Sequence, residues 1–317
     1  MPPDRKRTLQ PLAVLTGPTG TGKTDIALAL AREYPIEIIS VDSAQVYRGL
    51  DIGSAKPSAQ LRAQIPHHLI DLVEPNASYS AGQFVRDAAR AIDDIEARGR
   101  VPLLVGGTML YLRALMGGIA ELPEGDAGIR ARLVAEAVQN GWPTLHARLA
   151  EFDPVAAARI HPNDAQRIQR ALEVHAVTGE TITNLQAYTR SPLLRDFLTV
   201  ALIPQDRARL HAALAQRFEQ MMAAGLLDEV RGLYARGDLT DAAPSIRAVG
   251  YRQLWAHLAG SYSLETAVAR SVAATRQLAK RQMTWLRSMA NIAVVDPYDA
   301  QSFVGVRERL NGAFYLV

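Results

Sequence analysis

Short apolar runs separated by amphipathic stretches dominate the first third of the chain. Runs over 12–15, 36–41, 69–73 and 101–105 have the length and composition of buried strands, and 79–97 has helical spacing. This alternation is typical of a parallel sheet covered by helices on both faces, where ligands bind at the carboxyl ends of the strands. The expected fold class is therefore α/β.

The pattern changes after Gly117-Gly118, where the strand signals stop. Helical spacing then covers about 126–140, 144–151 and 163–178. Asn163 stands where a helix cap is expected and Gly179 where a helix ends. We therefore predict that a helical insertion over 118–197 interrupts the sheet domain begun by 1–117.

The last third returns to the sheet and is otherwise helical. An apolar run over 198–203 predicts another strand, and Ile292 to Val295 is a possible last one. Helical spacing covers 206–223, 226–235, 246–258 and 264–289. We expect 198–317 to complete the core sheet and to add a helical C-terminal region.

The most specific motif follows the first apolar run. It consists of Gly17, Pro18, Thr19, Gly20, Thr21, Gly22, Lys23 and Thr24. A glycine-rich turn between a strand and a helix is the context of a P-loop, whose backbone N–H groups point at phosphate oxygens. Lys23 adds a full charge, and the Thr24 hydroxyl can bind Mg²⁺. The chain is thus expected to bind a polyphosphate, although the motif does not say which group is transferred.

Two other strand ends carry candidate chemistry. Asp42 follows the run 36–41 and is a candidate Mg²⁺ ligand, general base or simple cap. The run 101–105 ends in Gly106-Gly107-Thr108, where many triphosphatases have a metal-ordering Asp. A glycine backbone that admits close approach, beside a hydroxyl, suits hydrogen bonding to a substrate better than metal binding.

Composition narrows the class of protein. The 317 residues carry a net charge of +3 and no cysteine, which excludes disulfides, thiolate catalysis and cysteine-based zinc sites. No apolar stretch approaches the roughly 18 residues of a membrane span, and the first residues do not resemble a cleavable leader. We expect a cytoplasmic protein, with a monomer as the default and no obligate protein partner.

The positive charge is concentrated near the C-terminus. Between Ser245 and Ile292 one acid, Glu265, faces the cations Arg247, Arg252, Arg270, Arg276, Lys280, Arg281 and Arg287. Such asymmetry is typical of a nucleic-acid site, and the alternative is a solvated helix face. Arg276 and Lys280 fall on one helical face and are candidate RNA contacts. The predicted insertion holds a second basic set of Arg159, His161, Arg167 and Arg170.

Taken together, these motifs resemble a known family over nearly the whole chain. The segments that carry the resemblance are 17–24, 39–47, 53–57, 66–71, 106–111, 161–164, 245–253 and 274–282. In this order and at these separations they resemble the bacterial tRNA dimethylallyltransferases, also called isopentenyl-tRNA transferases. The resemblance implies a P-loop NTPase-like parallel sheet and transfer of a dimethylallyl group from its diphosphate to the exocyclic N6 amine of the adenosine immediately 3′ of the anticodon.

The same resemblance implies roles for individual residues. Asp42 would accept the amine proton, and Thr108 would lie by the reacting centre. The P-loop would hold the diphosphate together with Lys23 and Arg217, and Thr24 would assist Mg²⁺. The insertion would clasp the anticodon stem-loop of the tRNA. The implied tRNA contacts are Asp42, Ser43, Ala44, Gln45, Thr108, Arg130, Gln166, Arg167, Ile168, Gln169, Arg170, Arg247, Ala248, Val249, Gly250, Tyr251 and Arg252.

Two other functions compete with this interpretation. A P-loop kinase of a small metabolite would account for the first third of the chain and leave the basic C-terminal helices without a role. A non-catalytic, nucleotide-gated RNA-binding protein would leave Asp42 and Gly106-Gly107-Thr108 unexplained. The ability to use dimethylallyl diphosphate rather than ATP discriminates between the three.

Overall fold

The computed structural model describes residues 10–120, 122–187, 193 and 195–314. Residues 1–9, on which the expected lack of a leader rests, lie outside that range. The chain divides into unit 1, which comprises Met1–Arg113 and Leu193–Val317, and unit 2, which comprises Ala114–Pro192. No helix in the described ranges is both long and apolar enough to cross a membrane.

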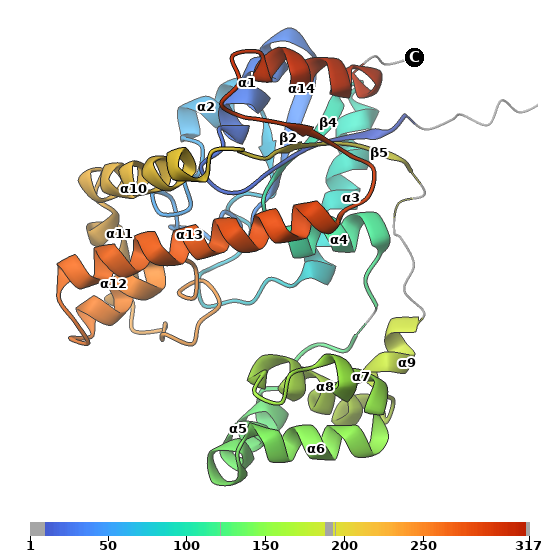
Figure 1. Cartoon of the computed structure of the whole chain (residues 1–317), viewed down its shortest axis with the longest axis vertical. Coiled ribbons are helices and arrows are strands. Elements are labelled where there is room, and N and C mark those ends of the chain that lie inside the picture. Colours follow the sequence, from blue (N-terminus) through green and yellow to red (C-terminus); the bar gives the residue numbers. More distant parts are fainter. Residues whose placement is uncertain (1–9, 121, 188–192, 194, 315–317) are drawn as a thin grey trace, which may run out of the picture. The chain divides into compact units, whose positions relative to one another are not determined.

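Unit 1 is built on a parallel sheet of six strands in its described part (Figure 1). The strands are β1 (Leu12–Thr16), β2 (Ile36–Val41), β3 (His67–His68), β4 (Val101–Gly106), β5 (Phe197–Leu202) and β6 (Ile292–Val295). Their order is β3-β2-β4-β1-β5-β6. Thr16 at the end of β1 pairs with Gly106 in β4 and with Ala201 in β5, and Val41 in β2 also pairs with Gly106. The register therefore brings the carboxyl ends of the central strands to one edge.

Helices cover both faces of this sheet. The helices of unit 1 are α1 (Lys23–Glu33), α2 (Ala59–Gln64), α3 (Ala81–Ala97), α4 (Met109–Gly117), α10 (Arg207–Ala223), α11 (Leu226–Tyr234), α12 (Tyr251–Leu258), α13 (Leu264–Ser288) and α14 (Ser302–Leu310), with a short 3₁₀ turn at Asn311–Ala313. Side chains of α1 and α14 share one core cluster with alternate residues of the strands, and α3 packs on the opposite face. α4 runs across the boundary between the units.

A second core joins the C-terminal helices to the segment after β2. Val46 and Leu50 are buried there against Phe218 of α10 and Leu254 of α12. α13 packs its Ala279 and Met283 against Leu210 and Leu214 of α10. The C-terminal helices are therefore fixed to the carboxyl edge of the sheet, where the P-loop begins.

Several predicted elements differ from the structure. The run 69–73 is not a strand, because Leu69 and Asp71 have positive φ angles of 62° and 56° that a strand cannot accommodate. On the side away from β4, β2 pairs in parallel with β3, which is formed by residues 67–68 directly before the predicted run. The predicted helix over 246–258 begins at Tyr251, and the hydrophobic pattern did not predict α2, α4 or α14.

Unit 2 is helical in its described residues. It contains α5 (Ala127–Asn140), α6 (Trp142–Phe152), α7 (Pro154–Arg159), α8 (Ala165–Thr178) and α9 (Ile182–Ala187) around a core that includes Leu133, Leu149, Ile168 and Leu172. Its limits differ from the predicted 118–197, because Phe197 already pairs with Leu12 in the sheet of unit 1. The cap of α8 is Asp164 rather than Asn163, and Gly179 ends that helix as predicted.

Candidate active site

A cavity of about 780 Å³ opens at the carboxyl edge of the sheet in unit 1. Its walls come from the P-loop, the ends of β2 and β4, the segment 53–57, α10, the turn before α12, and α13. The lining includes Thr19, Lys23, Thr24, Asp42, Ser43, Ala44, Gln45, Thr108, Arg217, Arg247, Ala248, Val249, Arg281 and Gln282. The structure therefore brings most of the predicted catalytic and diphosphate-binding residues together.

The P-loop adopts the geometry that its glycines allow. Gly17 has a φ of 151°, and a Cβ there would lie 2.7 Å from the Leu202 carbonyl oxygen. Gly22, with a φ of 73°, is the N-cap of α1, so the first N–H groups of this helix open toward the loop. Lys23 Nζ donates hydrogen bonds of 2.9 and 2.6 Å to the carbonyl oxygens of Gly17 and Pro18. The lysine side chain thus folds back along the P-loop, with which it is predicted to bind the diphosphate.

The protonation of Lys23 responds to its surroundings. Burial and the nearby Arg217 guanidinium together lower the pKa of its ammonium to about 7, although Asp42 opposes the change. A diphosphate in this loop would favour the charged form, because an anion close to an ammonium stabilises it. The loop is accordingly an anion site that gains positive charge as it fills.

Asp42 and Thr108 are held on the ends of adjacent strands. The Oδ1 atom of Asp42 accepts hydrogen bonds from the backbone N–H groups of Ala44 at 2.8 Å and Gln45 at 3.4 Å. Thr108 donates its backbone N–H to the Val41 carbonyl oxygen, and its Oγ1 accepts from the Ser43 N–H at 3.0 Å. Asp42 therefore caps a turn through one oxygen. Among the described residues no hydrogen bond reaches its Oδ2 atom, which is free to face a substrate.

The cavity has an excess of cations. Arg217, on α10, is half-buried and lies near enough to Lys23, Asp42 and Asp25 for their charges to interact. Burial lowers the pKa of its guanidinium, and the two carboxylates oppose that change. Arg247 and Arg281 also line the cavity and are exposed. None of these arginines forms an ion pair within 4 Å in the described part of the chain, so their charge is available to an anion.

Gln282 on α13 links two parts of the site that the sequence analysis treated separately. Its Oε1 accepts a hydrogen bond of 2.9 Å from the Thr19 N–H of the P-loop, and its Nε2 donates one of 2.8 Å to the Gly107 carbonyl oxygen. A Cβ on Gly107 would lie 2.5 Å from Nε2, so this approach requires a glycine. Gln282 was quoted in the resemblance but given no role, because an isolated glutamine on a helix carries no chemical signal.

A second missed residue is Glu229 on α11. Its carboxylate accepts hydrogen bonds from the backbone N–H groups of residues 51–53 and from the Tyr251 hydroxyl, the last at 2.6 Å. A Cβ on Gly53 would lie 2.6 Å from the Tyr251 ring. The carboxylate thus fixes the start of the segment 53–57, which lines the cavity. Tyr251, an implied tRNA contact, is fully buried and belongs to this support.

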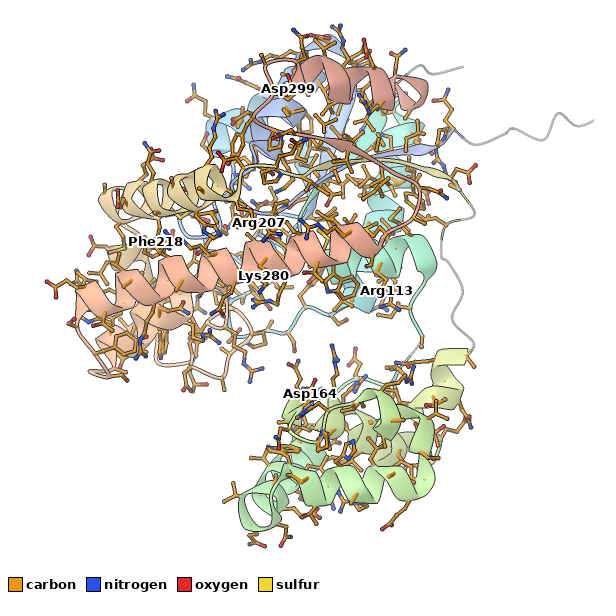
Figure 2. All side chains as sticks on the ribbon, viewed as in Figure 1. Arg113, Asp164, Arg207, Phe218, Lys280 and Asp299 are labelled. Atoms are coloured by element: carbon orange, nitrogen blue, oxygen red, sulfur yellow. The ribbon has the colours of Figure 1, made fainter. Side chains whose placement is uncertain are left out.

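The remaining candidate tRNA contacts of unit 1 come from the resemblance or from the basic C-terminal set. Arg247, Ala248 and Val249 line the cavity, and Arg252 is exposed beside Gly250, the N-cap of α12. Arg276 and Lys280 are exposed on α13 but do not line the cavity (Figure 2 marks Lys280). At 3.6 residues per turn they lie on the side opposite Leu278 and Trp285, which do line it.

The implied contacts in unit 2 are mostly engaged within that unit. Arg130 and Arg170 bind the fully buried Glu173 at 2.7 and 2.6 Å, and these guanidinium groups hold the pKa of its carboxyl below the ordinary range against the effect of burial. Ile168 is buried in the core of unit 2, so its side chain is not available for contact. The Gln169 amide donates to the Arg130 carbonyl oxygen. Gln166 and Arg167 are exposed.

The described residues contain no cluster of three or more His, Asp or Glu side chains that could hold a metal by themselves. Thr24, Asp25 and Asp42 do supply oxygen atoms around the P-loop end of the cavity. Mg²⁺ is usually held by one or two protein oxygens together with phosphate oxygens and waters. This donor set therefore fits Mg²⁺ that arrives with a diphosphate, and not a resident metal in an all-protein cage.

Comparisons with known proteins agree on one family. The model of IPP transferases matches residues 45–289, and that of isopentenyl transferases matches residues 10–70. A tRNA dimethylallyltransferase of Bordetella petrii is 54% identical over 291 residues, covering 90% of this chain and 92% of the relative. One from Alkalilimnicola ehrlichii is 55% identical over 301 residues, covering 95% and 94%.

Solved structures show the same likeness. A full-length tRNA isopentenylpyrophosphate transferase from Bacillus halodurans superposes with a TM-score of 0.71 and 35% identity, covering 96% of this chain and 97% of that one. A eukaryotic dimethylallyltransferase acting on tRNA superposes with a TM-score of 0.78 and 28% identity, covering 93% and 76%.

Proposed function

This chain belongs to the tRNA dimethylallyltransferase family, and we propose that it transfers a dimethylallyl group from dimethylallyl diphosphate to the exocyclic N6 amine of the adenosine immediately 3′ of the anticodon. The products are N6-isopentenyladenosine in the tRNA and diphosphate. One observation carries the proposal: a P-loop and a carboxylate with a free oxygen open into the same cavity of unit 1. A tRNA acceptor places the reaction in the cytoplasm.

The cavity accommodates the two halves of the reaction. The diphosphate lies in the P-loop, where backbone N–H groups, Lys23 and Arg217 stabilise the charge that develops as the bond between the allylic carbon and oxygen breaks. Leu214, Phe218 and Leu278 line the cavity and offer apolar surface to the five-carbon group. This arrangement binds the leaving group more strongly as its negative charge grows, which favours transfer.

Asp42 acts on the acceptor. The N6 nitrogen forms a bond to the allylic carbon, the electron pair of the broken carbon–oxygen bond leaves with the diphosphate, and the amine proton moves to the free oxygen of Asp42. Thr108 fixes the backbone at Ser43, which keeps the carboxylate beside the end of β4. We assign Asp42, Thr108, Lys23 and Arg217 to catalysis on this basis.

The donor set around the P-loop supports a Mg²⁺ cofactor. The Thr24 hydroxyl, at the first turn of α1, is the residue that would hold the ion together with diphosphate oxygens. When bound, the ion neutralises charge on the leaving diphosphate.

The tRNA is bound through residues from both units. In unit 1, the segment Asp42 to Gln45 and the turn at Arg247 to Val249 line the cavity and meet the extruded adenosine, because a base must leave its stack to enter a cavity in the protein. In unit 2, the exposed Gln166 and Arg167 are available for the anticodon stem-loop. Arg130 and Arg170 support this surface from within by their ion pairs with Glu173.

Replacement of Asp42 by Asn tests the proposal. The purified protein, Mg²⁺, dimethylallyl diphosphate and unmodified tRNA are mixed, and the tRNA nucleosides are analysed by mass spectrometry. Wild type should give N6-isopentenyladenosine. Asp42→Asn should reduce single-turnover transfer about 10²- to 10⁴-fold, the usual contribution of a general base. The amide oxygen can still cap the turn at Ala44, so folding and tRNA affinity should persist.

A parallel reaction with ATP in place of the prenyl donor separates the alternatives. The metabolite-kinase function predicts ATP consumption without any change in tRNA mass. Robust ATP hydrolysis that needs tRNA, with no modified nucleoside, would contradict transferase activity. If transfer by Asp42→Asn stays within a few-fold of wild type, Asp42 only caps the turn, and water or phosphate accepts the proton instead.

A further inference from the structure

Gln282 occupies the junction between the donor and acceptor halves of the cavity. The side chain is 9% exposed and reaches from α13 into the space between the P-loop and the end of β4. It is hydrogen-bonded on both sides, to the Thr19 N–H and to the Gly107 carbonyl oxygen. Both halves of its amide are therefore engaged, and its orientation is fixed by a donor and an acceptor on different elements.

Each of these two contacts leads to a reacting group. On one side, Thr19 belongs to the loop whose N–H groups receive the diphosphate. On the other side, Gly107 precedes Thr108, whose Oγ1 accepts from the Ser43 N–H, and Ser43 follows Asp42. A continuous path of hydrogen bonds and single peptide units thus joins the P-loop to the carboxylate, with Gln282 at its centre.

We propose that Gln282 is a positioning residue that sets the distance and orientation between the diphosphate held by the P-loop and the acceptor side held by Thr108 and Asp42. The inference rests on the proposed function and extends it to the relative placement of the diphosphate and the acceptor in the cavity. An amide suits this place because it accepts from one backbone group and donates to the other without adding charge beside a diphosphate. A displacement of about 1 Å between reacting groups can reduce a rate by about 10²-fold.

Gln282→Leu removes both hydrogen bonds at similar size. In single-turnover assays we expect transfer to fall about 10- to 100-fold, with an altered KM for dimethylallyl diphosphate and tRNA affinity within twofold of wild type. Gln282→Glu keeps the acceptor for Thr19 but cannot donate to Gly107, and it should also lose transfer. The matched control is Gln277→Leu, an exposed glutamine on the same helix, which should leave all three quantities unchanged.

A double-mutant cycle with Thr108→Val distinguishes positioning from general support of the fold. If loss of Gln282 already displaces Gly107 and Thr108, the second substitution adds little, and the double variant should retain at least fivefold more transfer than the product of the two single losses predicts. Thermal unfolding of each variant reports whether the fold is kept.

Three results would overturn the inference while leaving the proposed function intact: transfer within twofold of wild type in both Gln282 variants, a loss confined to tRNA affinity, or losses that multiply in the cycle. Failure of the wild-type protein to modify tRNA would instead reject the proposed function itself, so the two failures are distinguishable.

Discussion

The arginines of the two units differ in what their charges do. In unit 1, Arg217, Arg247 and Arg281 line the cavity without a carboxylate partner within ion-pair distance among the described residues. In unit 2, Arg130 and Arg170 bind one buried glutamate, Glu173. Arg247 and Arg281 on one side, and Arg170 on the other, belong to sets of residues that the sequence marks as basic. Positive charge along a sequence is therefore weak evidence of anion binding until the partner of each cation is known.

The difference has a physical basis. A carboxylate without solvent is strongly unfavourable unless cations compensate for its lost hydration, so Glu173 requires Arg130 and Arg170 for folding. Lys23 and Arg217 show the converse, because burial lowers the pKa of each and the protein supplies incomplete compensation. In unit 2 the paired arginines stabilise the fold, whereas the cavity of unit 1 holds cations that an incoming anion neutralises.

The largest expected effect on this comparison comes from Arg217→Ala. Removing one charged group that stabilises a developing anion usually reduces catalysis about 10²- to 10³-fold. We expect a loss of that size in single-turnover transfer, weaker inhibition by inorganic diphosphate, and little change in melting temperature. Arg270→Ala, on an arginine that stacks on Tyr262 outside the cavity, is the control. A variant that binds diphosphate like wild type would assign Arg217 to structure instead.

Glu173→Gln tests the other side of the comparison. The amide removes the charge that two guanidinium groups share, and we expect unit 2 to lose about 2 kcal/mol of folding free energy. Affinity of the protein for inorganic diphosphate should stay unchanged, because the P-loop and its cations lie in unit 1. Denaturant unfolding followed by tryptophan fluorescence, to which Trp142 of unit 2 contributes together with Trp255 and Trp285 of unit 1, reports the stability. A fall in diphosphate affinity without a change in stability would contradict the division between the units.

The ion pairs of Glu173 also make the stability of unit 2 depend on pH in the acid range. The arginines hold the pKa of the Glu173 carboxyl below its ordinary value, so its stabilising contribution is complete above that value and is lost as the pH falls through the lower, folded-state pKa. The difference in melting temperature between wild type and Glu173→Gln should therefore be constant near pH 7 and shrink below about pH 4. A difference that grows in acid would show that the carboxyl is not stabilised in its charged form.

The smallest effect concerns the exposed stripe on α13. Replacing Arg276 and Lys280 by Ala should weaken tRNA binding and reduce the slope of log affinity against log salt by about one unit per lost phosphate contact. These cations differ from both groups of arginines compared above, because they are exposed and lie outside the cavity. Filter binding at several salt concentrations measures it. Unchanged affinity and slope would make the stripe a solvated helix face.

Much of the sheet could be predicted from the sequence, because buried parallel strands are short apolar runs. The strands at 36–41 and 292–295 match the predicted limits, and α1 begins where the P-loop motif places it. The run 69–73 misled because its apolar residues serve a loop with positive φ angles, in which Lys56 and Arg62 hold Asp71 through ion pairs. Hydrophobicity reports burial there, but not backbone conformation.

The site was predictable only where a motif names its chemistry. Lys23, Asp42 and Thr108 follow strands and lie in one cavity, as parallel topology requires. Gln282 and Glu229 were missed because their roles depend on partners far away in the sequence. The resemblance implies a tRNA contact at Tyr251, and its residue type gives no sign that its side chain is buried. Such residues become visible when both ends of a hydrogen bond are located.

The hydrogen bond between Thr19 and Gln282 joins positions 263 residues apart. A ribosome adding about 5–20 residues per second needs on the order of ten to fifty seconds to cover that interval. During that time the P-loop lacks its hydrogen bond to the Gln282 amide. β1 also lacks one of its neighbouring strands, because β5 follows unit 2 in the chain. Unit 2, whose core comes from one continuous segment, can fold in the meantime. Nascent chains that stop before α13 should therefore transfer poorly, and the site is completed only after α13 has been synthesised.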